Sequence, residues 1–205
     1  MVREGLRSLL QCEADMEVVG EADDGHAAVR MAQELAPDII IMEVALPNLN
    51  GIEATRQIVP KTAATKVIAL TAHAEKSVVA QMLKVGADGY LLKDCAIEEL
   101  ITAIRAVAVN QAYLSNEVTS VLIEQFVRNS PNHEDSAFSV LTPREREVLQ
   151  LVTEGQSTKK IANRLRLSTK TIEFHRHQLM KKLDLHSVAA LTKYAVREGI
   201  TTLDG

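Results

Sequence analysis

Residues 141–175 carry a close series of helix start and stop signals, which constrains the fold more tightly than any other part of the chain. The run Thr142–Glu145 combines an N-cap threonine, a proline at the first helical position and a glutamate at the third. Gly155 then provides a left-handed stop. A second helix is predicted over 157–165 and, after a short turn, a third over 168–183, capped by its serine. This pattern is typical of a helix-turn-helix.

The third predicted helix has one apolar face and one polar face. Ile172, Leu179 and Leu183 fall on the side that would pack inward. The opposite side carries a stripe at helical spacing, formed by Lys170, Glu173, Phe174, His177 and Lys181. A helix that enters the major groove of DNA needs this combination of an apolar seat and exposed donors and acceptors. The alternative is the solvated face of an ordinary bundle helix, and we favour DNA binding.

The net charge of −4 is unevenly distributed along the chain. Residues 141–205 hold 12 Lys and Arg against 7 Asp and Glu, whereas residues 1–140 hold 11 against 20. A basic module behind an acidic one indicates attachment to DNA through the C-terminal part only. Cys12 and Cys95 are too few for a disulfide framework or a metal site. With no 18-residue apolar run and no signal-peptide layout, we expect a cytoplasmic protein without a membrane partner.

Residues 2–109 alternate short apolar runs with amphipathic segments. Strands are predicted over 17–22, 38–43, 66–70 and 89–92, and helices over 2–12, 26–35, 52–59, 75–85 and 97–109. Apolar strands separated by single helices predict a parallel sheet that is covered on both faces. Ligands of such sheets bind beyond the carboxyl ends of the strands, which here carry Glu43, Thr71 and Lys93.

The C-terminal motifs resemble the DNA-binding domain of the LuxR/NarL family of transcription regulators. The resemblance rests on the LTPRE opening, the Ile161–Ala162 pair and the LSxxTIxxH run of 167–175. It implies a fourth helix over 187–198, which carries much of the contact within a homodimer on double-stranded DNA. It also implies roles by position: phosphate contacts from Thr169, Lys170 and Lys181, and base-edge contacts from Glu173, Phe174 and His177.

Each base-edge role has an alternative that the sequence leaves open. Phe174 could cover a neighbouring side chain, and Glu173 could pair with Lys170 or His177 along the same helix.

The N-terminal motifs PDIIIME, LPNLNGIEATR, VIALTAH and GADGYLLKD are similar to the receiver domain of two-component response regulators. The resemblance implies a flavodoxin-like sheet and a sensor histidine kinase as the upstream partner. It places Glu43 at the phosphoacceptor position, and Thr71 and Lys93 where the family holds the phosphoryl oxygens. Tyr90 matches the aromatic residue whose rotamer reports the switch. In the family, the unphosphorylated receiver can also cover the recognition helix.

Two departures from the receiver pattern bear on its chemistry. The family has aspartate where this chain has Glu43, whose carboxylate reaches one methylene further and would displace an in-line transfer geometry. The first strand and the acidic pair that follows it in the family, which holds Mg²⁺, are missing. Glu43 alone is a poor Mg²⁺ site, so we expect no cofactor and no phosphotransfer. Either Glu43 imitates the phosphorylated state or the switch is lost; we favour loss.

The missing first strand also predicts a structural problem. In the family it lies between the second and third strands, so its removal leaves two interior edges and an apolar gap. Three solutions are open: residues 17–22 pair directly with 38–43, an outside strand fills the slot, or the natural chain starts upstream of Met1.

We therefore predict an α/β receiver-like domain that lacks its first strand, followed by an all-α helix-turn-helix domain. The expected boundaries are 1–110 for the receiver-like domain, 111–137 for a linker with a helix over 117–128 and a flexible joint over 129–136, and 138–205 for the DNA-binding domain.

The predicted function is a DNA-binding transcription regulator that is not controlled by ordinary aspartate phosphorylation. The alternatives are a pseudo-receiver that serves as a protein-interaction module, and a truncated form of a phosphorylation-controlled regulator. An enzyme is disfavoured because we find no nucleophile elbow, metal-ligand cluster or phosphate loop. A quorum-type sensor of small molecules is disfavoured by the strand–helix alternation and the absence of Trp.

Overall fold

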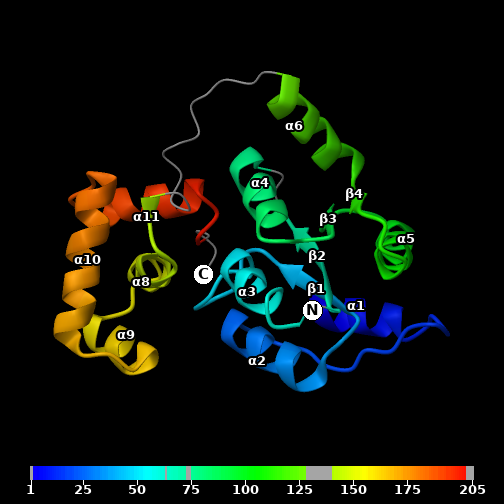
Figure 1. Ribbon diagram of the computed structural model, residues 1–205, viewed down its shortest axis with the longest axis horizontal. Helices are drawn as coiled ribbons and strands as arrows, with labels where there is room; N and C mark the ends of the chain where they lie inside the picture. The colour runs from blue at the N-terminus through cyan, green and yellow to red at the C-terminus, as the bar shows by residue number, and fades with distance from the viewer. Residues whose placement is uncertain (1, 63, 73–74, 128–139, 202–205) are drawn as a thin grey trace.

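A four-stranded parallel sheet with the order β1-β2-β3-β4 forms the centre of the N-terminal part of the chain (Figure 1). The structure, a computed structural model, describes residues 2–62, 64–72, 75–127 and 140–201. The elements of this part are α1 (Val2–Leu10), α2 (Gly25–Leu35), β1 (Ile39–Glu43), α3 (Gly51–Ile58), β2 (Lys66–Thr71), α4 (Lys76–Lys84), β3 (Gly89–Leu92), α5 (Ile97–Ala108), β4 (Tyr113–Leu114) and α6 (Asn116–Val127).

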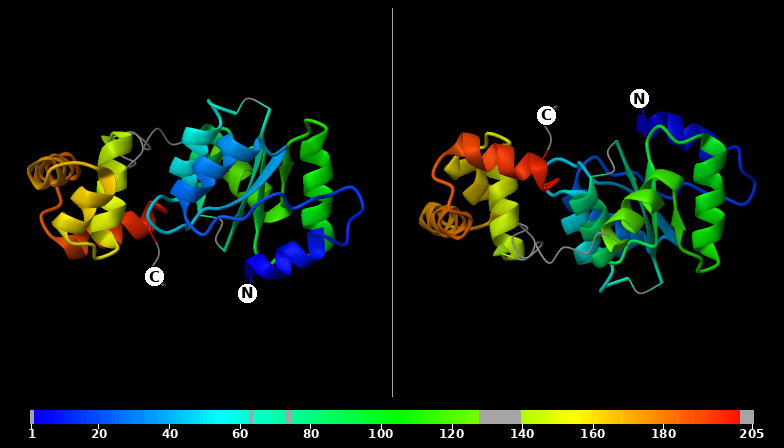
Figure 2. Two further views of the ribbon diagram at one scale, coloured as in Figure 1. Left: turned by 90° about the horizontal axis from the view of Figure 1, so that it is seen from below. Right: turned by 90° about the horizontal axis from the view of Figure 1, so that it is seen from above.

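Helices cover both faces of this sheet (Figure 2). On one face, α2, α3 and α4 pack against the strands in a core that includes Met42, Ile52 and Val79. On the other face, α1 and α5 cover a second core that includes Ile68 and Leu91. The predicted parallel sheet with two covered faces is therefore confirmed. The apolar runs in the sequence are uninterrupted because both faces of the sheet are covered by helices.

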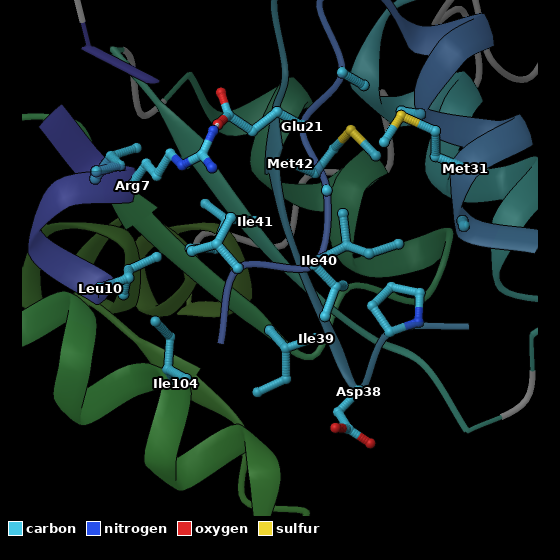
Figure 3. A pocket seen from close by; sticks show the side chains of 18 of the residues that line it. Arg7, Leu10, Glu21, Met31, Asp38, Ile39, Ile40, Ile41, Met42 and Ile104 are labelled. Carbon is cyan, nitrogen blue, oxygen red and sulfur yellow. Dashed lines mark hydrogen bonds and ion pairs between the residues drawn. The ribbon is translucent and has the colours of Figure 1, made fainter. Parts of the chain in front are cut away.

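The strand predicted over 17–22 is wrong, because these residues form no strand. A strand needs a ladder partner, and β1 pairs with β2 alone among the described residues. A groove separates the extended segment 17–22 from β1, so the two do not close directly on each other (Figure 3). The sequence pattern also missed β4, whose two residues are too few to show a period.

Within residues 141–201, four helices form at bounds close to those that the start and stop signals predict. They are α8 (Pro143–Thr153), α9 (Thr158–Leu165), α10 (Thr169–Leu183) and α11 (Val188–Arg197). Their shared core includes Leu149, Ile161, Ile172, Leu179 and Leu191, all nearly inaccessible to solvent. The helix-turn-helix prediction is therefore confirmed.

Local hydrogen bonds explain where these helices begin and end. The Thr142 side chain accepts from the Glu145 amide at 3.3 Å, and the Glu145 carboxylate accepts from the Thr142 amide at 2.8 Å, which completes the predicted capping box. The Ser168 hydroxyl accepts from the Thr171 amide at the start of α10. Gly155 follows α8 with a φ of 77°, the left-handed conformation that the sequence assigned to it.

The predicted linker helix forms as α6, which starts at Asn116 and ends at Val127. Its predicted last residue, Arg128, and the predicted joint over 129–136 lie outside the described residues.

Candidate functional site

The carboxyl ends of three neighbouring strands bring the receiver-type residues together. Glu43 ends β1, Thr71 ends β2, and Lys93 directly follows β3. The Lys93 ammonium forms an ion pair with the Glu43 carboxylate, and the Lys93 amide donates to the Thr71 carbonyl at 2.7 Å. The second oxygen of Glu43 accepts from the Ala45 amide at 3.1 Å. The glutamate is therefore held at both oxygens, with its negative charge beside a lysine.

Tyr90, the predicted switch aromatic, lies in β3 and is fully buried. Burial raises the pKa of its hydroxyl, and the nearby Glu75 and Glu43 carboxylates raise it further. The ring therefore occupies an inward position in the core beside the strand-end residues.

The residues around Glu43 do not fit a Mg²⁺ site. This ion prefers octahedral oxygen ligands and is usually held by more than one carboxylate or by a substrate phosphate. Among the described residues, no group of three or more His, Cys, Asp and Glu side chains could hold a metal ion. The Glu43 oxygens already face a lysine and a backbone amide. No step of phosphoryl transfer through a metal can be derived from this arrangement.

The loop that follows Glu43 joins β1 to α3 and lies against the C-terminal helices. Gly51 starts α3, and its amide donates to the Val44 carbonyl at 2.8 Å, which folds the loop back on the end of β1. A Cβ atom at Gly51 would lie 2.1 Å from the Glu43 carbonyl oxygen, so only glycine allows this close return. Residues 44–50, which we call the acceptor loop, are thereby fixed beside the strand-end site.

Side chains of α8 contact the acceptor loop across the junction of the two parts. The Gln150 side chain accepts from the Asn50 amide at 2.9 Å and donates to the Leu46 carbonyl at 3.0 Å. The Glu154 carboxylate accepts from the Asn48 amide at 3.0 Å. Gln150 is only 1% exposed, so its side chain takes the place of water as the hydrogen-bond partner of the loop backbone.

An ion pair next to these contacts is almost fully buried. The Arg146 guanidinium donates to both carboxylate oxygens of Glu53 in α3, at 2.7 and 3.1 Å, and side-chain exposures are 4% and 2%. Arg56 approaches the same carboxylate at 3.1 Å. A bidentate pair of this kind fixes the orientation of two elements, because leaving either charge buried without a partner costs several kcal/mol.

Sequence reasoning missed this junction. Its signal is the spacing of Arg146, Gln150 and the C-cap residue Glu154, which recur every four residues and therefore lie on one side of α8 and its end. The same spacing is typical of a solvated helix face, so the pattern alone does not distinguish the two environments.

The predicted DNA-facing residues line the outer side of α10. Among the described residues, Thr169, Lys170, Glu173, Phe174, His177 and Lys181 are all exposed, and Phe174 is 59% accessible. The alternative role for Phe174, covering a neighbour, is limited to an edge contact with the ring of His175. In Figures 1 and 2, α10 lies at the end of the molecule far from the sheet, and α8 and α11 lie between α10 and the sheet. The N-terminal part therefore leaves this face uncovered.

Comparisons with known proteins agree with this architecture. The profile of the response regulator receiver domain matches residues 1–105, and the profile of the luxR family of bacterial regulatory proteins matches residues 139–195. The response regulator UvrY of Escherichia coli (strain K12) is 35% identical over 200 residues, which span 98% of this chain and 91% of that protein.

Two solved structures show a similar arrangement of the whole chain. RcsB from Salmonella enterica serovar Typhimurium, bound to a promoter in the presence of a phosphomimetic, has a TM-score of 0.59 at 26% identity and covers 96% of this chain and 93% of its own. A structure of two RcsB dimers bound to two parallel DNAs has a TM-score of 0.56 at 26% identity, with 96% and 92% covered.

The fold and the sites together define a receiver-like α/β part followed by a LuxR-type helix-turn-helix part. This chain belongs to the DNA-binding response regulators of two-component systems, in the NarL/FixJ type with a LuxR-type DNA-binding domain. Across the part of the chain that the structure describes, every helix is too short or too polar to cross a lipid bilayer.

Proposed function

We propose that this protein regulates transcription by placing α10 in the major groove of double-stranded DNA, without control by ordinary phosphorylation of an aspartate. The exposed face of α10 is the observation that carries the first half of the proposal. Its lysines extend from a helix whose opposite side is seated in the core by Ile172 and Leu179. This is the geometry that a recognition helix requires.

The roles within this face follow from side-chain chemistry. Thr169, Lys170 and Lys181 contact phosphate oxygens and fix the position on the duplex. Glu173 accepts from a cytosine amino group, Phe174 contacts a thymine methyl group, and His177 donates to a base or a phosphate. A homodimer would present two such helices to two half-sites, as the RcsB dimers on DNA suggest.

The second half of the proposal rests on Glu43. Its carboxylate is already engaged by the Lys93 ammonium and the Ala45 amide. Phosphoryl transfer from a sensor histidine kinase is therefore not the signal. Substitution Glu43→Asp alone should not restore phosphorylation, because the residues around it do not fit the metal. Uptake of a phosphoryl group by that variant, from acetyl phosphate with Mg²⁺, would refute this half.

The proposed organisation assigns residues 1–110 to the receiver-like domain, 111–137 to the linker and 138–205 to the DNA-binding domain. The receiver-like domain touches the other through α8 and through Gly199 after α11, and it leaves α10 open, which supports a permissive arrangement rather than a covered one. Because its partner is DNA, we propose that the protein acts in the cytoplasm.

Salt-dependent DNA binding tests the role of α10. A preferred duplex is selected from a random library, and its affinity for the full chain is then measured over a salt series. Lys170→Ala and Lys181→Ala should each reduce the slope of log K against log salt by about 1, since each phosphate contact releases about one counterion. Lys84→Ala, at an exposed position of α4, is the matched control and should leave the slope unchanged. A chain that binds no duplex above background would instead favour a protein-interaction module.

A further inference from the structure

Among the described residues, the two parts of the chain share no apolar core. One apolar cluster lies wholly within 140–200, and the other two lie within 6–122. The two parts are joined by the polar contacts of α8 and by Gly199, which lies against Val78 of α4. The cores can therefore stay packed when this junction opens, as they do at domain interfaces that form and separate reversibly.

The polar contacts of the junction fix an orientation more than they add stability. Arg146 and Glu53 form an ion pair that is almost fully buried. Burial removes both charges from water, and this cost offsets most of their attraction. Gln150 likewise exchanges hydrogen bonds with water for hydrogen bonds with the backbone of Asn50 and Leu46. The open and closed states of the junction therefore differ only modestly in free energy.

The tip of the acceptor loop is held by side chains of the C-terminal part. Asn48 has a φ of 68°, in the left-handed region that asparagine tolerates better than most residues. Its amide donates to Glu154 at 3.0 Å, and its side-chain carbonyl accepts from Gln156 at 3.4 Å. Its side-chain amide donates to Asp24 at 3.4 Å. Asp24 in turn lies 3.6 Å from the guanidinium of Arg164 in α9.

The base of the same loop is held by the strand-end site. The Glu43 carboxylate accepts from the Ala45 amide at 3.1 Å and pairs with Lys93. Between base and tip, Leu49 is fully buried in the core. A short loop that is packed in this way transmits a displacement of one end to the other, because close-packed groups do not move separately. The contacts of Glu43 and those of α8 therefore act on one unit.

We propose that the acceptor loop and α8 form a reversible latch, in which docking of the C-terminal part and the contacts of Glu43 are thermodynamically coupled. Such coupling is reciprocal: opening at α8 loosens the loop, and weaker contacts of Glu43 favour opening. The outer face of α10 is exposed in the closed state (Figure 1). The latch therefore controls the orientation of the DNA-binding part rather than access to α10. This inference goes beyond the proposed DNA binding and is independent of it.

Hydrogen exchange of the full chain without DNA tests the latch. The amides of Asn48 and Asn50 are its reporters, because each donates to a side chain of the C-terminal part. Gln150→Ala should speed their exchange by about tenfold, since it removes one partner and favours opening. Glu43→Gln, which removes the charge at the loop base, should speed it by about threefold. Gln178→Ala in α10 is the matched control and should change neither amide.

A double-mutant cycle distinguishes one coupled unit from two separate effects. If the latch exists, Glu43→Gln adds little in a chain that Gln150→Ala has already opened, so the two effects are less than additive. Glu154→Gln keeps an acceptor for the Asn48 amide and should retain most of the protection that Glu154→Ala loses. Glu154→Ala replaces Gln150→Ala in the cycle if the latter does not fold. Additive effects, or reporter amides that exchange as fast in the wild type as in Gln150→Ala, would overturn the proposal.

Discussion

At the scale of single residues, Glu145 joins the start of α8 to α10. Its carboxylate accepts from the Thr142 amide at 2.8 Å and from the Lys182 ammonium at 2.7 Å. Burial alone would raise the pKa of this carboxyl, but the hydrogen bonds from Lys182 and Thr142 outweigh it and lower the pKa. The charged form is therefore bound more favourably in the folded chain than in the unfolded one.

This shift predicts a pH dependence of stability. The contribution of Glu145 is complete above the ordinary value of 4.5 and is lost as the pH falls through the lower folded pKa. Glu145→Gln keeps a capping side chain but loses the charge, so its free energy of unfolding should fall less steeply below about pH 5. Urea unfolding from pH 7 to 3 measures this, with the exposed Glu173→Gln as control. Parallel pH profiles for wild type and Glu145→Gln would contradict the assignment.

At the scale of elements, the sequence predicts features that depend on local signals and does not predict those that depend on long-range contacts. The ends of α8 and α10 could be predicted because Thr142, Gly155 and Ser168 act within four residues of their own positions. The apolar pattern of 17–22 predicts a strand because apolar character is a local property. Whether the segment has a ladder partner depends on the rest of the fold, and in the sheet it has none.

The candidate sites divide in the same way. The strand-end positions of Glu43, Thr71 and Lys93 follow from the order of strands and helices, so their meeting could be predicted. Burial of Arg146 and Glu53 could not, because it depends on how the two parts of the chain dock.

The pair between α8 and α3 gives the prediction at this scale. Arg146→Met should destabilise the junction by about 3 kcal/mol, the low end for a broken buried pair, because Arg56 still neutralises Glu53. The double variant Arg146→Met with Glu53→Met should recover most of this loss. Denaturant unfolding checks both, with Arg144→Met as the control within α8. Additive losses in the double variant would show that the pair is not coupled.

At the scale of the whole molecule, a short chain of contacts connects the acceptor position to the DNA-binding domain. The Glu43 carboxylate holds the Ala45 amide, the acceptor loop continues to Asn50, and Gln150 of α8 binds that loop. A second contact brings Gly199, after α11, against Val78 of α4, where a Cβ atom would lie 2.4 Å from the valine side chain. Both contacts lie away from the outer face of α10, so DNA binding and domain docking are compatible.

The most direct measurement is the affinity of the full chain for its selected duplex over a salt series, with and without acetyl phosphate and Mg²⁺. Under the proposed function, we expect log K to fall linearly with log salt and the affinity to be the same in both conditions, because the outer face of α10 is already exposed and we propose that Glu43 accepts no phosphoryl group. An affinity that rises more than tenfold with the donor, together with incorporated phosphate, would contradict it.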